Sequence, residues 1–171
     1  CLNPNRFGDL IDYFGGRRDL EEGIIRILYN LSFVEDPTRI LRAIRFEQRY
    51  SFTIEPDTLR FAIDAIERRM LGKLSYKRIL HELILILNEK DPGSSLDRMK
   101  EIGLWKYILP EVKLEHLNRV TLKRISIMVS WLEERYYPVN VKAWLVYIVV
   151  LLARLSEDEV EGVLERYPFD N

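Results

Sequence analysis

From residue 33 onward, apolar residues recur at the spacing of an α-helix, and this pattern continues through most of the remaining chain. Short segments rich in turn-forming residues interrupt it. These segments are SFTIEPD, LGKLS, EKDPGSS, LPEVK, YYPVN and LSEDE. Divided at these points, the pattern predicts about seven helices, and the short connections favour antiparallel or steeply crossed neighbours. A mainly α, multi-helix bundle is therefore expected.

Residues 1–31 have a different pattern, with prolines and glycines spaced through short apolar runs such as DLIDYF and GIIRIL. Strand and turn fragments fit this pattern best. The change near residue 32 is therefore the main predicted boundary. The first residues, CLNPNRFGDL, contain neither an initiator methionine nor a secretory signal, so we expect a piece of a longer protein.

Composition limits the function classes. With 47% hydrophobic and 31% charged residues the chain resembles a soluble globular protein, and its net charge of -1 does not indicate a general polyanion binder. The single cysteine, Cys1, excludes an internal disulfide framework and favours a reducing compartment, the cytoplasm by default. The apolar run WLVYIVVLLA at 144–153 is too short to cross a bilayer, so a buried helix is predicted and no membrane partner is expected.

Four arginines form a stripe on the first long predicted helix. At about 100° per residue they fall within an arc of roughly 120°, opposite the apolar side. Two interpretations stay open: a solvated face whose acids lie elsewhere, with Glu35 paired to the first arginine, or a surface that faces a polyanion. The stripe consists of Arg39, Arg42, Arg45 and Arg49.

The start of this helix carries two competing signals. Ser32 and Glu35 have the spacing of a capping box, while Asp36 followed by Pro37 reads as an N-cap with proline at the first helical position. The second is favoured, because a proline further inside would remove a helix hydrogen bond. Asp36 and Arg39 then project as neighbours and offer an acceptor beside a fork of donors, which matches the edge of a nucleobase.

Two segments resemble a known family at this point. YFGGRRDLEEGIIRIL and SFVEDPTRILRAIRF are similar, in order and spacing, to consecutive segments of the class II tRNA nucleotidyltransferases, the CCA-adding, A-adding and CC-adding enzymes and their poly(A) polymerase relatives. LSYKRILHELILIL resembles the next segment, with Lys77 where the family usually has glutamate. The resemblance covers residues 1 to about 110. It implies a head remnant at 1–31, a neck with the nucleotide template at 32–110 and a helical body at 111–171.

The resemblance implies a role for each residue of the stripe except its last, which stays unassigned and is expected to be solvated. Asp36 and Arg39 would read the base of ATP or CTP in place of a template strand. Arg42 would approach the triphosphate. Arg45 is placed with them in the nucleotide-binding set, with bracing of the neck as an alternative.

The glycine segment DYFGGRRDL matches the family in Asp12, Gly15, Gly16 and Asp19, and is expected to support the junction between head and neck. Its glycines fit either a turn with positive φ or direct substrate contact. The carboxylates that hold Mg²⁺ in this family belong to an upstream head domain and to an Asp-x-Asp motif that this sequence lacks. No catalytic or metal-binding residue is therefore predicted here, and the piece alone is expected to be inactive.

Weaker predictions concern RNA. Arg78 either binds RNA or forms a surface pair with Glu82, and a basic group further on either contacts the tRNA backbone or is a solvated face. His81 and His116 lack other ligands nearby and do not suggest a metal site. The basic group consists of Arg119, Lys123 and Arg124.

The function implied for the whole protein is the addition of A or CCA to the 3′ end of tRNA, with ATP, and CTP for CCA addition, as substrates. A poly(A) polymerase of the same superfamily is one alternative. A non-enzymatic helical module that binds RNA or protein is the other, and it would keep the arginine stripe but reduce Asp36 to a helix cap. The sequence does not predict an oligomeric state.

Overall fold

The computed structural model describes residues 11–114, 119–136 and 141–169. Nine α-helices lie within these ranges, together with two 3₁₀ turns at Met70–Lys73 and Trp105–Tyr107. The α-helices are α1 (Gly16–Glu22), α2 (Ser32–Glu35), α3 (Thr38–Tyr50), α4 (Pro56–Glu67), α5 (Tyr76–Leu87), α6 (Pro92–Glu101), α7 (Arg119–Arg135), α8 (Ala143–Leu152) and α9 (Glu157–Arg166). The two strands are β1 (Ile24–Ile25) and β2 (Thr53–Ile54).

The predicted interruptions coincide with helix ends. Glu55 caps α4 by accepting the backbone N–H of Thr58 at 2.8 Å, and Pro56 occupies the first helical position. Ser156 and Glu159 form a capping box at the start of α9. From α3 onward, the described residues contain seven helices of ten or more residues, which confirms the predicted segmentation and the mainly α class.

The N-terminal segment is only partly as predicted. The expected strand is present as β1, which pairs in parallel with β2. GRRDLEE, however, forms helix α1 rather than strand or turn, and its C-terminal Gly23 takes the left-handed conformation that ends a helix. Arg26 pairs with Asp19 at 3.0 Å and approaches Glu55 at 3.6 Å, so this segment is tied to the start of α4.

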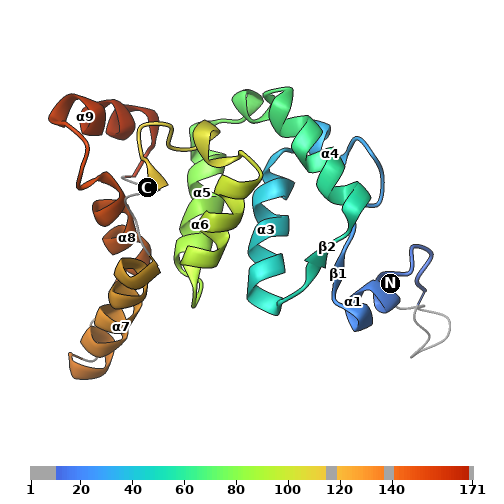
Figure 1. The fold of residues 1–171 in the computed structure, drawn as a ribbon, viewed down its shortest axis with the longest axis horizontal. Helices are drawn as coiled ribbons and strands as arrows, with labels where there is room; N and C mark the ends of the chain where they lie inside the picture. The colour runs from blue at the N-terminus through green and yellow to red at the C-terminus, as the bar shows by residue number, and fades with distance from the viewer. Residues whose placement is uncertain (1–10, 115–118, 137–140, 170–171) are drawn as a thin grey trace.

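The helices are arranged in three groups (Figure 1). α3, α5 and α6 stand side by side in the centre, with α1 and α4 to one side and α7, α8 and α9 to the other. α3 packs against both α5 and α6, and α5 packs against α8. One apolar core runs from Phe33 and Leu41 through Leu83 to Val163, so it links all three groups.

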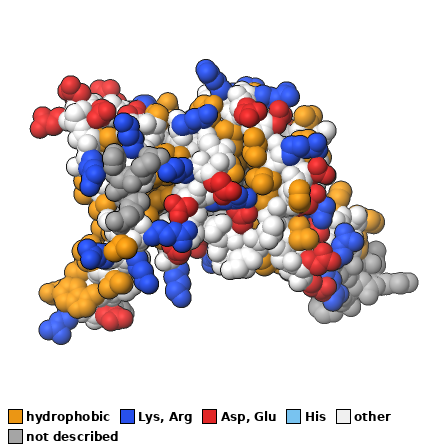
Figure 2. Space-filling model, in the orientation of Figure 1, with side chains coloured by type: hydrophobic (Ala, Val, Ile, Leu, Met, Phe, Trp, Pro, Cys, Tyr) orange, Lys and Arg blue, Asp and Glu red, His pale blue; other side chains and the backbone are white. Residues whose placement is uncertain are grey.

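Helix α8 is the apolar run that was predicted to be buried. Tyr147, Ile148 and Leu151 face the core, whereas Leu145 and Val149 on the opposite side are exposed. Among the described residues, no helix combines the length and apolar character needed to cross a membrane. Figure 2 shows basic and acidic side chains interspersed over the face drawn, in keeping with the nearly balanced net charge.

Candidate nucleotide-reading site

The predicted start of the arginine helix contains two helices. Ser32 begins the one-turn helix α2, Asp36 follows its end, and α3 begins at Thr38, one residue later than predicted. Pro37 nevertheless has helical backbone angles, and the Asp36 carboxylate accepts the Thr38 backbone N–H at 3.2 Å, as an N-cap does. Both sequence signals therefore mark helix starts, and Asp36 lies between them.

Asp36 is held through one oxygen. Its Oδ1 accepts hydrogen bonds from the Thr38 hydroxyl at 2.6 Å and from Arg78 Nη2, on α5, at 2.9 Å, in addition to the backbone bond. Burial alone raises the pKa of Asp36, but the bonds from Thr38 and the charges of Arg78 and Arg39 outweigh it and lower the pKa below its usual 3.8. The carboxylate is therefore ionised at neutral pH. Oδ2 makes no hydrogen bond within the described residues.

Arg39 is also held through one atom. Its Nη1 donates to the hydroxyl of Ser32 at 2.7 Å, and Ser32 is buried. The predicted pair with Glu35 does not form, because Glu35 instead accepts a hydrogen bond from the Tyr29 hydroxyl. The remaining N–H groups of the Arg39 fork make no hydrogen bond in the described part of the chain. An open acceptor on Asp36 and open donors on Arg39 thus stand one helical turn apart.

The other arginines of the stripe have different surroundings. Arg42 is exposed and forms no ion pair with any described residue. Arg45 is buried on α3 and its guanidinium lies 3.5 Å from Glu82 and 3.7 Å from Glu89, both contributed by or directly following α5. Arg49 pairs with Glu89 at 3.3 Å. The second half of the stripe is therefore neutralised inside the molecule.

The glycine segment forms the start of α1. Gly15 has φ of +70°, which satisfies the predicted turn. Asp12 accepts the backbone N–H groups of Arg17 at 2.8 Å and Gly16 at 3.0 Å, and these bonds lower its pKa. Asp19 is buried against Arg26. All four predicted support residues thus stabilise one turn and its helix.

The RNA predictions meet mixed geometry. The predicted surface pair between Arg78 and Glu82 does not form, because Arg78 turns to Asp36 and Glu82 turns to Arg45. Arg119 pairs with Asp97 at 2.8 Å on the surface, which raises its pKa further. Lys123 and Arg124 on α7 are exposed.

No cluster of three or more potential metal ligands occurs within the residues that the structure describes. His81 is exposed, and His116 lies outside the described residues. The carboxylates of the nucleotide-reading site are occupied by donors from Thr38 and Arg78, so their chemistry does not fit a resident Mg²⁺ ion.

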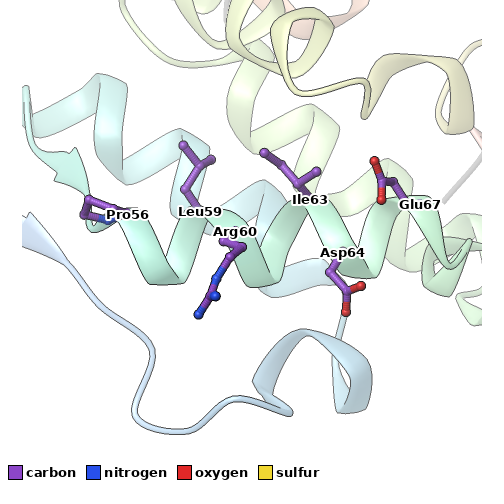
Figure 3. A pocket seen from close by; sticks show the side chains of 6 residues that line it. All are labelled: Pro56, Leu59, Arg60, Ile63, Asp64 and Glu67. Carbon is purple, nitrogen blue, oxygen red and sulfur yellow. The ribbon is translucent and has the colours of Figure 1, made fainter.

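A shallow hollow runs along α4 (Figure 3). Leu59 and Ile63 project to one side of the helix, and Arg60 and Asp64 project to the other. Because all of its lining residues come from this one helix, it is an open helix face rather than a cleft, and it contains none of the predicted site residues. It is lined by Pro56, Leu59, Arg60, Ile63, Asp64 and Glu67.

Sequence reasoning missed the partners that fix the site. Ser32 was considered only as a capping residue, and Thr38 and Tyr29 were not singled out. The available signal was the position of Ser32, which lies two helical turns before Arg39 and so on the same side of the helix pair.

Comparisons with known proteins agree with this geometry. Residues 51–115 match the family described as "Probable RNA and SrmB-binding site of polymerase A". The A-adding tRNA nucleotidyltransferase of Geobacter sulfurreducens is 42% identical over 165 residues, which cover 96% of this chain and 19% of that protein.

Solved structures of CCA-adding enzymes have the same fold. A complex with ATP superposes with a TM-score of 0.86 at 40% identity, covering 97% of this chain and 40% of that one. The Thermotoga maritima enzyme with tRNA superposes with a TM-score of 0.83 at 39% identity and the same two shares. The chain thus spans about a fifth of its curated relative and two fifths of the solved enzymes. It belongs to the class II tRNA nucleotidyltransferase family, as a partial and mainly helical region of it.

Proposed function

We propose that the full-length protein adds A, or CCA, to the 3′ end of tRNA, and that this region selects the incoming nucleotide and helps to hold the tRNA. ATP is the substrate for A, and CTP is added to it if the product is CCA. One observation carries the proposal: Asp36 and Arg39 are each fixed through a single atom and leave an acceptor and donors open side by side. The similarity to A-adding and CCA-adding enzymes supports it.

The open groups match only two of the four bases. Adenine and cytosine each present an exocyclic amino donor beside a ring-nitrogen acceptor. Asp36 Oδ2 accepts from the amino group, and the Arg39 fork donates to the ring nitrogen. Guanine and uracil present a carbonyl and a ring N–H instead, so two acceptors and two donors would face each other. An unpaired buried polar group costs about 1 to 3 kcal/mol, which is enough for selection.

Arg42 and Arg45 take different parts in this proposal. Arg42 is one turn beyond Arg39, exposed and without an ion pair among the described residues, so it is assigned to the triphosphate. Guanidinium forks match phosphate oxygens and keep their charge at physiological pH. Arg45 is assigned to supporting the site from behind, because its charge is already paired with Glu82 and Glu89. The turn around Gly15 and Asp12 would support the junction with the head.

The tRNA contacts are the less detailed part. The family description matched by residues 51–115 supports an RNA-binding role for α4 to α6. Lys123 and Arg124 on α7 remain candidates for the tRNA backbone, since both are exposed and unpaired in the described region. A cytoplasmic location belongs to the same proposal.

Mg²⁺ is part of the proposed reaction but not of this region. When bound, it activates the attacking 3′-hydroxyl and neutralises triphosphate charge. Because the described residues offer no metal cluster, the ion is assigned to carboxylates of the full-length protein that lie outside this chain.

The test is substitution of Asp36 and Arg39 in the full-length protein. We expect Asp36→Ala and Arg39→Ala to lower the preference for ATP over GTP and UTP by about 10- to 100-fold in kcat/KM, with the fold retained. Asp57→Ala is the matched control, because Asp57 is an exposed acid at the start of α4 that pairs only with Arg60. If Asp36→Ala costs only the roughly 1 kcal/mol of a lost cap and leaves nucleotide preference unchanged, base reading is excluded.

Poly(A) polymerase activity is the second candidate, favoured by the description of the matched family. The same purified protein distinguishes the two. A tRNA nucleotidyltransferase stops after completing the 3′ end of tRNA, whereas a poly(A) polymerase extends unrelated RNA by many adenosines.

A further inference from the structure

We propose that Ser32 is a positioning residue that sets the orientation of Arg39 and thereby contributes to nucleotide choice. This inference rests on the proposed function of Arg39 as a base reader. Ser32 Oγ accepts a hydrogen bond from Arg39 Nη1 at 2.7 Å, and it is the only hydrogen-bond partner of this guanidinium among the described residues. A serine that was expected at most to cap a helix therefore holds a predicted specificity residue.

Burial makes this contact unusually well defined. Only 4% of Ser32 is exposed, so its hydroxyl has little access to water and favours a protein partner. The donor is a charged guanidinium, and bonds of this kind are about twice as strong as those between neutral groups. The bond therefore anchors one corner of a planar fork whose other N–H groups point elsewhere.

Helix α2 places the hydroxyl. The Ser32 backbone N–H donates to the Tyr29 carbonyl at 3.2 Å, and the Ser32 carbonyl accepts the Asp36 N–H at 3.1 Å. Tyr29 also donates its hydroxyl to Glu35, which removes the acid that would otherwise compete for Arg39 at i,i+4. One turn of helix thus presents Ser32 to Arg39 and keeps Glu35 away from it.

Asp36 receives a parallel support from another side. Thr38 and Arg78 occupy its Oδ1, just as Ser32 occupies one nitrogen of Arg39. Both reading groups are therefore oriented before a nucleotide arrives. An arginine side chain has several rotatable bonds, and fixing one end of its fork lowers the ordering cost that base binding would otherwise carry. Loss of the Ser32 hydroxyl should loosen Arg39 without removing it.

The experiment compares Ser32→Ala, Arg39→Ala and the double variant in the full-length protein. For each, kcat and KM are measured separately for ATP, CTP, GTP and UTP, and unfolding temperature is recorded. We expect Ser32→Ala to lower the preference for ATP over GTP by about tenfold, chiefly by raising the KM for ATP. In the Arg39→Ala background the same change should have no further effect on that preference.

Ser95→Ala is the matched control. Ser95, on α6, is 1% exposed and its hydroxyl has no hydrogen-bond partner in the described structure, so the variant loses a buried hydroxyl without touching the site. It should leave the nucleotide preference as in the wild type. Should Ser32→Ala fail to fold, Ser32→Cys keeps nearly the same volume with a weaker acceptor and is expected to shift the preference in the same direction.

The outcomes separate this inference from the proposed function. If Arg39→Ala changes nucleotide preference but Ser32→Ala lowers kcat equally for all nucleotides, Ser32 is only structural and the inference is overturned. Full additivity of the two substitutions would overturn it as well, since Ser32 would then act independently of Arg39. If Arg39→Ala itself leaves the preference unchanged, base reading fails first and the role of Ser32 fails with it.

Discussion

The two halves of α3 use the same residue type in opposite ways. In the first half, Arg39 and Arg42 keep most of their donors free, and Arg39 is held only by a neutral hydroxyl. In the second half, Arg45 and Arg49 are paired with acids at the far end of α5. A stripe that is uniform in sequence is thus divided into an open part and a neutralised part.

The position of the acids on α5 creates this division. Glu82 is buried and Glu89 is half-buried, and both lie beside the C-terminal half of α3. At the other end of the same helix pair, α5 presents Arg78 to Asp36 instead. α5 therefore supplies negative charge where the arginines are structural and positive charge where the acid is functional. The partner helix, rather than the stripe itself, distinguishes support from recognition.

The largest expected effect is on Arg45. Its side chain is about 10% exposed, as is that of Glu82, so Arg45→Ala leaves a buried carboxylate without its main partner. Removal of one member of a buried pair costs roughly 3 to 5 kcal/mol. For a region of this size we expect the unfolding temperature to fall by roughly 10 °C. Thermal unfolding of the full-length protein, followed by hydrogen exchange in α3, measures it.

Arg42→Ala is the comparison for that prediction. Because Arg42 is exposed and unpaired among the described residues, its loss should change stability by less than about 0.5 kcal/mol. Equal losses from Arg42→Ala and Arg45→Ala would show that the two halves of α3 do not differ as described.

Much of the fold could be predicted because it depends on local signals. Helix starts such as Pro56, Pro92 and Ser156 carry proline or capping chemistry that is readable in sequence. α1 was missed because it has only seven residues between glycines, too short for a helical period to stand out. The parallel pairing of β1 with β2 joins segments far apart in sequence, and a two-residue strand leaves almost no pattern.

The site could be predicted only in its exposed half. Asp36 and Arg39 were found because their spacing and their resemblance to a family are both local. Their partners were not found, since Arg78 lies 42 positions after Asp36 in the sequence. The i,i+4 spacing of Arg78 and Glu82 suggested a pair that was already satisfied, yet tertiary partners on α3 take both side chains. A local pairing rule worth a few tenths of a kcal/mol does not outweigh such contacts.

A smaller effect is expected from acid at the open end of α3. The pKa of Asp36 is lowered in the folded protein, so its ionised form contributes stability above its ordinary pKa of 3.8, and this contribution is lost as the pH falls through the lowered value. Asp36→Asn keeps an acceptor for Thr38 but has no charge to titrate. We therefore expect the variant to lose less stability than the wild type between neutral pH and pH values below 3.8. Unfolding midpoints measured across this range test it.

Asp57→Asn provides the control for the acid titration, because Asp57 is largely exposed and pairs only with Arg60. It should follow the wild-type pH profile closely. A wild-type profile that is parallel to that of Asp36→Asn would mean that the bonds from Thr38 and Arg78 do not favour the ionised carboxylate.

The smallest effect is expected for Arg49, at the outer end of the neutralised half. Its side chain is 49% exposed and pairs with Glu89 at 3.3 Å, and exposed ion pairs contribute about 0.2 to 1 kcal/mol. Arg49→Ala should therefore lower the unfolding temperature by a few degrees at most, and less at high salt, since screening weakens the pair in the wild type as well. Nucleotide preference should not change. If it does change, the open part of the stripe extends to Arg49, and the division of α3 into recognising and supporting halves has been drawn in the wrong place.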